Sequence, residues 1–402
     1  MPQKKANPAL ASLSTTYWPR VITLWLCGVL AAMQFSKISF AFQTLQATYE
    51  ATPTAMGWIL STVGTVGLVL GVTAGLCAPA IGYRRLLLVG MGLGAVLALL
   101  QSLILPFELL WLTRLFEGFS QLAVVVAAPV LIIRQSARRH HSLVMGLWST
   151  FVTVAFALTA AGGGWVLAHF HLRGLFLVHA SGLTMMFVLV LLMVPKDAAQ
   201  AQPWPALTAL PRLHLRLYQH WVTALPGLCF FCYTSTAIAL LTFVPQYAGA
   251  DRAWVAVILP FAAISGTFSA GWLAQSLVAP RRLVLGAFTA MALVGLGLGG
   301  CLMAGLRMAP VAVLLTYSVG LAGGSSFALI PYLSHEPAVQ ARANGAVAQM
   351  GNLGSTLGPP LFALMISTFG APGLVLPVVG FALLGCGWMV MSSRTDNQPP
   401  CV

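Results

Sequence analysis

The sequence predicts an all-α membrane protein in which twelve transmembrane helices form two six-helix bundles. Three observations support this fold class. Only 7% of the 402 residues are charged, whereas a soluble domain carries roughly 25%. Hydrophobic residues make up 59% of the chain and fall into stretches that can cross a bilayer, which takes about 20 helical residues. The basic residues gather on alternate loops, a pattern typical of multi-pass membrane proteins.

Each expected span must be helical, because backbone polar groups find no water in hydrocarbon. The predicted spans are 20–42, 55–80, 85–105, 109–133, 143–168, 172–195, 224–247, 252–276, 281–304, 310–333, 344–367 and 372–392. A long polar interruption separates six spans from six. We therefore predict an N-terminal bundle over 1–195, a cytoplasmic linker over 196–222 and a C-terminal bundle over 223–402. The basic end of that linker fits a helix on the membrane surface or an ordinary solvated segment equally well.

The net charge of +13 is distributed as the positive-inside rule requires. With the N-terminus inside, fifteen Lys and Arg residues fall on the cytoplasmic side, and only Arg173, Arg252 and Arg307 fall outside. This bias predicts cytoplasmic termini and contact with anionic lipid, and it argues against a nucleic-acid partner. The N-terminus lacks the layout of a cleaved signal peptide, so the first span is predicted to be retained.

The usual enzyme and cofactor motifs are missing from the sequence. There is no GxxxxGK[ST] phosphate loop, GxSxG or HExxH, so we expect neither ATP-driven transport nor an enzyme. The CxxC pair Cys229 and Cys232 lies inside a predicted span, where two small packing residues are the simpler interpretation than a redox or zinc site. We therefore predict no metal and no cofactor.

The two halves carry similar loops, GLCAPAIGYRRLLLVG after the second span and GWLAQSLVAPRRLVLG after the eighth. The corresponding residues are Gly75 with Gly271, Ala78 with Ala274, and Arg84 and Arg85 with Arg281 and Arg282. An internal repeat of this kind is typical of transporters whose halves rock about a site near the membrane centre.

These loops resemble the major facilitator superfamily, whose hallmark between spans two and three is G-x-L-A-D-R-x-G-R-R. Gly75, Ala78, Gly82 and Arg84 fit that pattern, whereas Pro79 stands in place of the family's Asp. The resemblance implies that Gly75, Gly82 and the Arg pairs of both halves serve conformational change, without the latch that the Asp provides. It also implies that spans 1, 4, 7 and 10 line a central cavity, spans 2, 5, 8 and 11 flank it, and spans 3, 6, 9 and 12 face lipid.

Span four, LLWLTRLFEGFSQ, resembles the family's R-x-x-Q-G pattern, with Glu117 in place of Gln. The Gly-Pro antiporter signature of span five is not matched, which weakens an antiport interpretation. Polar and aromatic residues concentrate in the spans that the resemblance places around the cavity. The candidates for substrate binding are Gln34, Lys37, Gln121, Trp148, Thr150, Tyr233, Tyr317, Gln349 and Asn352.

Glu117 is the only acid inside a predicted span, and an intramembrane carboxyl is a functional hypothesis by default. Arg114 lies one helical turn earlier on the same face. The two residues fit proton coupling or a buried structural ion pair. Lys37 fits either snorkelling to the interface or a cavity in which it and Arg114 outnumber Glu117 and favour anions. We expect water to wet all three side chains in a crevice shared by both bundles.

Glycines at helical spacing let membrane helices approach and slide. Gly358 with Pro359 is a candidate bend for gating, and packing alone is the alternative. Taken together, the sequence predicts a monomeric, proton-coupled secondary transporter of the bacterial inner membrane that moves a small organic solute, with a weak preference for an anion. The alternatives are an efflux pump for amphipathic drugs or siderophore-like compounds, and a sensor or assembly partner that transports nothing.

Overall fold

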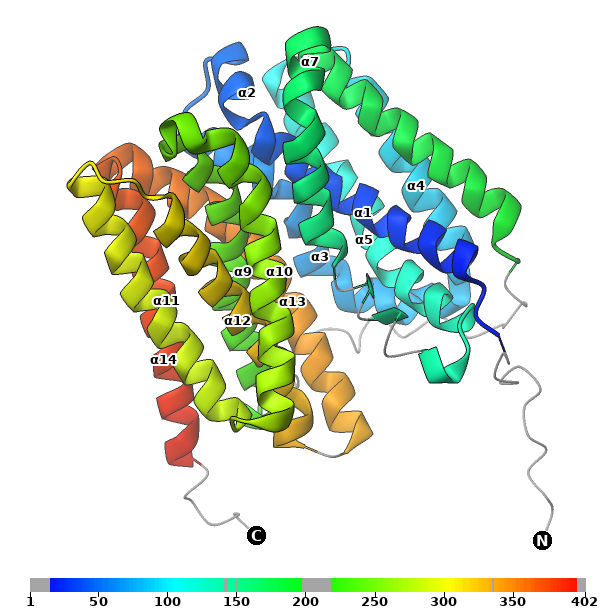
Figure 1. The fold of residues 1–402 in the computed structure, drawn as a ribbon. Helices are drawn as coiled ribbons and strands as arrows, with labels where there is room; N and C mark the ends of the chain where they lie inside the picture. The colour runs from blue at the N-terminus through cyan, green and yellow to red at the C-terminus, as the bar shows by residue number, and fades with distance from the viewer. Residues whose placement is uncertain are drawn as a thin grey trace, which may run out of the picture.

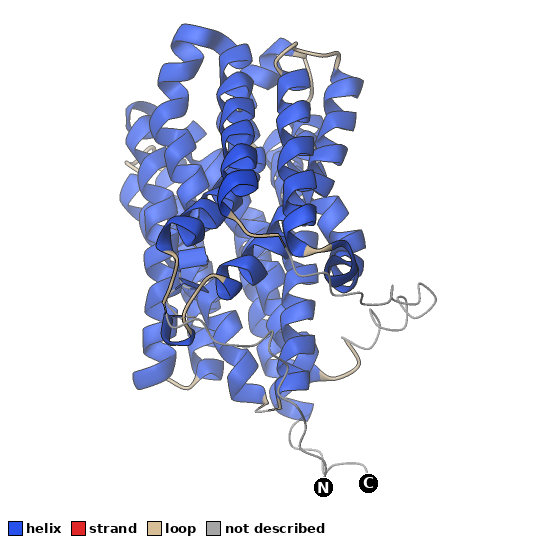
Figure 2. Cartoon of the chain, turned by 90° about the vertical axis from the view of Figure 1, so that its right-hand side faces the viewer, coloured by secondary structure: helices blue, strands red, loops and turns tan. Residues whose placement is uncertain are grey.

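The computed structural model describes residues 15–140, 144–145, 147–148, 150–196, 218–334 and 336–395. Within these ranges the chain is helical and contains no strand (Figure 2). The predicted linker 196–222 lies mostly outside the described residues, since 197–217 are not among them. The all-α prediction is confirmed.

The helices follow the predicted spans, most of them to within four residues at either end. Their bounds are α1 (Trp18–Phe40), α2 (Phe42–Thr48), α3 (Pro53–Ile81), α4 (Tyr83–Gln101), α5 (Phe107–Arg134), α7 (Phe151–Met193), α9 (Trp221–Phe243), α10 (Arg252–Ser276), α11 (Pro280–Met303), α12 (Ala309–Leu333), α13 (Pro337–Phe369) and α14 (Pro372–Thr395). The short helix α2 was not expected. One-turn segments η2 (Arg138–His140), η4 (Val244–Tyr247) and η5 (Gly249–Asp251) complete the described elements.

The fifth and sixth predicted spans correspond to the two helical arms of α7, which meet at a sharp kink at His171. A straight helix of its 43 residues would be about 65 Å long, twice the roughly 30 Å hydrocarbon core. His171 takes φ 54° and ψ −163°, and this residue reverses the chain (Figure 1). Ten described segments are long and apolar enough to cross a membrane. With α7 counted as two passes and the more polar α13 added, the fold has twelve.

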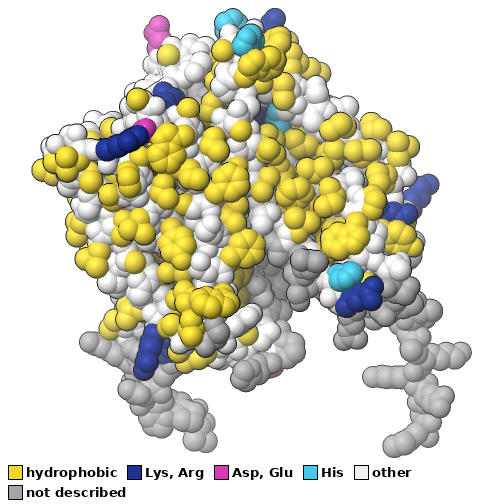
Figure 3. Space-filling model, viewed as in Figure 1, with side chains coloured by type: hydrophobic (Ala, Val, Ile, Leu, Met, Phe, Trp, Pro, Cys, Tyr) yellow, Lys and Arg dark blue, Asp and Glu magenta, His cyan; other side chains and the backbone are white. Residues whose placement is uncertain are grey.

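The helices form two sets, α1–α7 and α9–α14, which we call the first and second halves. The start of α1 and the end of α14 lie on one side of the molecule, which we call the terminal side (Figure 1). The two halves converge on the opposite side and splay apart toward the terminal side. Large apolar side chains, among them Leu192 and Met303, are exposed on the outer surface, and yellow side chains dominate the face shown in Figure 3. Such a surface is suited to lipid.

The glycines of α3 show where the two halves are in contact and where they lie apart. A Cβ on Gly57 would lie 2.7 Å from the Cα of Pro360 on α13, and one on Gly67 would lie 2.6 Å from the side chain of Asn352. Only small residues allow backbones to approach this closely. Gly71, one turn further along the same face, would meet nothing within 4 Å. The two halves are therefore packed on the opposite side and parted on the terminal side.

Candidate functional site

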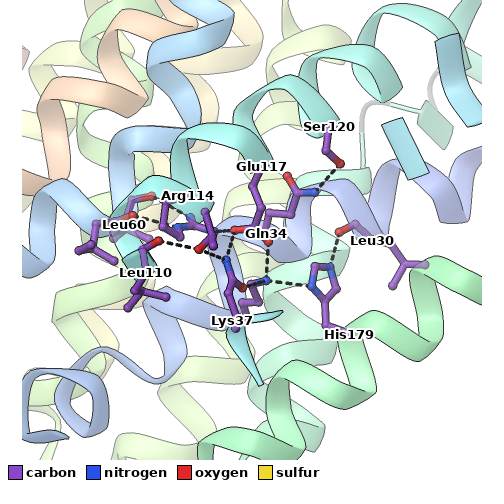
Figure 4. Close-up of polar contacts among 12 residues, drawn as sticks. Leu30, Gln34, Lys37, Leu60, Leu110, Arg114, Glu117, Ser120 and His179 are labelled. Carbon is purple, nitrogen blue, oxygen red and sulfur yellow. Dashed lines mark hydrogen bonds and ion pairs between the residues drawn. The ribbon is translucent and has the colours of Figure 1, made fainter. Parts of the chain in front are cut away.

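A cluster of linked polar side chains lies inside the first half, and we call Lys37, Gln101, Arg114, Glu117 and His179 the charged cluster (Figure 4). At its centre, the Lys37 ammonium lies 2.6 Å from Oε1 of Glu117, 2.8 Å from Oε1 of Gln101 and 3.0 Å from Nδ1 of His179. An ammonium has three N–H donors, and each one here has an acceptor. Lys37 is therefore fully satisfied as a buried cation.

Glu117 is the acceptor that balances this charge. Its second oxygen, Oε2, accepts hydrogen bonds from Nη1 of Arg114 and, at 2.9 Å, from Nε2 of Gln101. Arg114 also donates to the carbonyl oxygens of Ile59 and Leu60 on α3, at 3.0 and 3.3 Å. The helical spacing of Arg114 and Glu117 on α5 creates the pair, as the sequence predicted, and α3 orients the guanidinium.

Two members of the charged cluster come from spans that were expected to face lipid. Gln101 ends α4 and His179 lies in the second arm of α7, yet both are buried. That expectation was wrong for these residues. The signal was present in the sequence, since a polar side chain in an apolar span is costly unless it points into the protein. These two residues were not chosen as candidates because the family layout assigned their spans to lipid.

The expected water-filled crevice around the charges is also not what the structure contains. Lys37 is 2% exposed, and Arg114 and Glu117 are fully buried. Lys37 therefore does not snorkel to the interface, and the cluster lies within the first half alone. With His179 neutral, the cluster still carries the predicted net charge of +1, but this charge does not line a cavity.

The other first-half candidates mostly hold helices together. Gln34 is buried on α1 and donates to Ser120 of α5 at 2.9 Å. Thr150 accepts a hydrogen bond from an indole N–H of α1 at 3.3 Å, and Trp148 is buried against the same helix. Gln121 is partly exposed on α5. These residues do not converge with Lys37 on one binding surface.

The second-half candidates are also dispersed. Tyr233 of α9 lies against Gly323 of α12. Tyr317 lines a hollow formed by α10 and α12 alone. Gln349 of α13 accepts a 3.0 Å hydrogen bond from Tyr218. Asn352, on the same helix, contacts the first half as described above.

The family-type loop after α3 forms a tight turn. Gly82 takes φ +91°, a conformation that favours glycine. Arg84 donates to the carbonyl oxygens of Val194 and Leu191 at 2.7 and 2.9 Å. It therefore ties the start of α4 to the end of α7 within the first half. Arg85 is exposed.

The corresponding loop of the second half lies on the same terminal side. Arg281 and Arg282 fall in the first turn of α11. Gly75 and Gly271, the matched glycines of the two halves, would each meet nothing within 4 Å if they carried a Cβ. Both therefore leave room for movement on this side.

Gly358 lies at a close contact between α13 and α9. A Cβ there would overlap the backbone of Ser235 on α9, and on the other face of α13 the carbonyl oxygen of Pro359 lies 3.1 Å from where a Cβ of Gly57 would be. The helix continues through Pro359 to Phe369. This segment of α13 is thus held between α9 and α3.

A cavity of about 330 Å³ lies between the halves on the opposite side. Hydrogen bonds join the halves around it. Ser39 and Thr242 share one at 2.6 Å, and Gln43 donates to Gln246 at 3.3 Å. The lining residues are Ser36, Ser39, Phe40, Gln43, Phe156, Ala160, Gly164, Leu241, Thr242, Pro245, Gln246, Ala250, Arg252, Ala253 and Ala256.

Arg252 brings a positive charge to this cavity, and it was not among the sequence candidates. It donates to the neutral Oε1 of Gln43 at 2.7 Å. The neighbouring Asp251 is engaged elsewhere, because Arg307 donates to both of its oxygens at 2.8 Å and Trp254 donates at 2.9 Å. These hydrogen bonds raise the pKa of Arg307 above its ordinary value. Arg252 is thus left without an acid partner in these contacts.

Twelve helical passes lie in two halves that are parted on the terminal side and joined on the opposite side, where a cavity lies between them. This is the architecture of a multi-pass membrane transporter. The family model of the Major Facilitator Superfamily matches residues 24–359. The chain belongs to this superfamily and is a transporter rather than an enzyme.

Curated relatives and solved structures agree with this assignment. The chain is 26% identical over 408 residues to the 3-(3-hydroxy-phenyl)propionate transporter of Escherichia coli strain K12, covering 95% of this chain and 96% of that protein. It is 29% identical over 198 residues to the multidrug efflux pump LfrA of Mycolicibacterium smegmatis, covering 48% of this chain but only 38% of the pump's length. A bacterial homologue of the human lysosomal transporter Spinster, solved in an inward-facing and occupied conformation, shares the fold with a TM-score of 0.70 at 15% identity, over 95% and 98% of the two chains.

Proposed function

We propose that this protein is a proton-coupled secondary transporter that moves a small organic anion by alternating access. The observation that carries the proposal is the contrast along α3, whose glycines pack against α13 on the opposite side and face open space on the terminal side. The basic residues of the sequence favour a cytoplasmic terminal side. On that assignment, the protein is open to the cytoplasm and closed to the exterior, in the inner membrane of a bacterium.

Helix α1 supports the coupling part of the proposal, because it carries Lys37 of the charged cluster and, nearer its end, Ser39, which contacts the second half on the side opposite the terminal side. Lys37 extends from α1 to Glu117, and Ser39 and Gln43, further along the chain, contact the second half. Protonation of Glu117 removes the only buried carboxylate among the described residues. Two buried cations then face each other without a counter-charge, which is unfavourable in a low-dielectric interior. We expect the loss of the Lys37–Glu117 attraction to loosen α1 and its contacts across the cavity.

The anion preference rests on the cavity between the halves. Arg252 is a cation at its edge with a neutral hydrogen-bond partner, while Phe40 and Phe156 provide apolar walls. Ligand sites of this kind combine an apolar lining with a few placed polar groups, and volumes from about 300 Å³ are usual. The Escherichia coli relative is named for an aromatic carboxylate, which fits such a site.

Efflux of amphipathic drugs is the second candidate, because relatives such as LfrA are drug pumps. A cationic drug needs an acid to receive it. Glu117, the one fully buried acid of the described residues, is already paired with two cations. The charge distribution therefore favours the anion.

Uptake into proteoliposomes tests the proposal. The probes are 3-(3-hydroxyphenyl)propionate as the anion and ethidium as the cation, each with and without a pH gradient. We expect gradient-driven accumulation of the anion and none of ethidium. Glu117→Gln should abolish the accumulation. The double variant Lys37→Met with Glu117→Gln removes the ion pair as a unit, so it should fold and exchange the anion without responding to the gradient. Full gradient-driven uptake by Glu117→Gln would overturn the proton-coupling role.

A further inference from the structure

The two ring nitrogens of His179 in the charged cluster have different hydrogen-bond partners. Nδ1 lies 3.0 Å from the Lys37 ammonium, and Nε2 lies 2.9 Å from the carbonyl oxygen of Leu30 on α1. An ammonium only donates and a carbonyl only accepts. The tautomer that satisfies both contacts therefore carries its proton on Nε2 and presents the lone pair of Nδ1 to Lys37. His179 is 4% exposed, so no bulk water competes for that lone pair.

We propose that His179 takes the proton of Lys37 when Glu117 becomes protonated, which makes it the third member of a proton relay. The inference rests on the proposed function, whose coupling site it extends. In the step, an N–H bond of Lys37 breaks and an N–H bond forms at Nδ1 of His179. Lys37 becomes a neutral amine, and the imidazole becomes an imidazolium. No oxidant or further reactant is needed, since one proton enters on Glu117 and one moves from Lys37 to His179.

The charges around His179 give this transfer its direction. The charged groups that face it are Lys37 from α1 and Arg114 and Glu117 from α5. The side chain that α4 contributes to the cluster, Gln101, is neutral. Once Glu117 is neutral, Lys37 and Arg114 are two cations on the same carboxyl group. Moving the proton to Nδ1 carries one positive charge away from Arg114, while Nε2–H keeps its bond to Leu30. Charges in a low-dielectric interior repel strongly, and this gain in separation from Arg114 opposes the ordinary preference of the proton, roughly 4 pKa units, for an amine over an imidazole.

In this relay, proton uptake also weakens the contact between α1 and α7. In the resting cluster, Lys37 and His179 hold α1 to α7 by a hydrogen bond to an ammonium and by the bond to Leu30. After transfer, the charge that fixed Lys37 between α5 and α7 resides on α7. The end of α1 that carries the contacts across the cavity is then less firmly held.

The matched variants are His179→Asn and His169→Asn, which change two histidines of the same helix. The Asn side-chain oxygen can still accept from Lys37, but it does not take up a proton. His169 is exposed, and its described contacts are a hydrogen bond to the backbone oxygen of Trp165 and ring contacts with Trp165 and Phe170, all outside the charged cluster. With 3-(3-hydroxyphenyl)propionate as the probe and a pH dye inside proteoliposomes, we expect His179→Asn to lose proton movement at least tenfold and to lose anion exchange by a smaller factor. His169→Asn should keep both. Normal proton movement in His179→Asn would overturn the relay.

A measurement without any solute separates the relay from the proposed function. Infrared difference spectra on acidification detect the protonated carboxyl of Glu117, identified by its loss in Glu117→Gln. With ¹⁵N-labelled histidine, an imidazolium signal that disappears in His179→Asn should accompany that carboxyl signal. A wild-type protein that moves no protons with the anion yet shows both signals would sink the proposed function and leave the relay supported. A protonated Glu117 with a neutral His179 would sink the relay itself.

Discussion

The two halves repeat one helical arrangement, but their buried polar groups behave differently. In the first half, side chains of α1, α4, α5 and α7 bond to one another through the charged cluster. In the second half, most buried hydroxyls bond to the backbone of their own helix, as Ser235 does to Phe231 and Thr316 to Ala312, while Thr242 also bonds to Ser39 of the first half. No charged side chain among the described residues of the second half is fully buried. A duplicated fold therefore does not require duplicated chemistry, and the stability of one half depends on charge balance while that of the other depends on close packing.

The largest test of this contrast is the removal of the balancing carboxylate. Glu117→Ala leaves Lys37 and Arg114 buried without an anion, and breaking a buried pair in this way costs about 3–5 kcal/mol. The double variant Lys37→Met with Glu117→Ala should recover only part of the loss, because it removes the Lys37 cation while Arg114 stays buried without an anion. Thermal unfolding of the purified protein measures both.

The matched change in the second half is Ser235→Ala. It deletes a hydrogen bond to the same helix, which is worth about 1 kcal/mol or less. If Ser235→Ala lowered the unfolding temperature as much as Glu117→Ala, the contrast between the halves would be wrong.

An effect smaller than that of Glu117→Ala is expected where the close packing of glycines, rather than charge, stabilises the structure. In Gly358→Ala the new methyl group would overlap the backbone of Ser235, and overpacking of this kind costs about 1–3 kcal/mol. Gly71→Ala meets nothing and should gain roughly 0.5–1 kcal/mol from its better helix propensity. In the proposed alternating-access mechanism, however, Gly71 lies on the α3 face that meets α13 when the terminal side closes. We therefore expect Gly71→Ala to be stable but slow in transport, and unchanged turnover would show that this face never closes.

The fold could be predicted from the sequence because the patterns that indicate it are local. Span length, low charge and alternating loop charge are each readable within about twenty residues. The pairing of Arg114 with Glu117 was predictable for the same reason, since it follows from helical spacing. The turn at His171 falls between the fifth and sixth predicted spans, so its position was also predicted.

The remaining parts of the site depend on contacts between distant segments. Lys37 meets Glu117 across 80 positions and His179 across 142, and no sequence spacing encodes those distances. The family layout placed α4 and the second arm of α7 against lipid as whole helices, although each helix has an inner and an outer face. Arg252 was assigned to an outer loop, and its position beside the cavity follows from the packing of α10 against α7.

The smallest predicted effect concerns the side opposite the terminal side, where hydrogen bonds join the two halves around the cavity. Gln43 contacts Gln246 and Arg252 at once, so Gln43→Ala removes both links without changing any charge. Because both bonds are exposed to solvent, we expect the two together to contribute about 0.5–1 kcal/mol, which shifts a two-state equilibrium roughly two- to fivefold. We expect hydrogen exchange of residues 244–256 to speed up by that factor while α4 and α5 stay unchanged. Ser269→Ala, which deletes an exposed hydroxyl bonded only to its own helix in the described contacts, is the control. Equal exchange in both variants would mean that the apolar contacts between α3 and α13, and not these hydrogen bonds, keep the halves together.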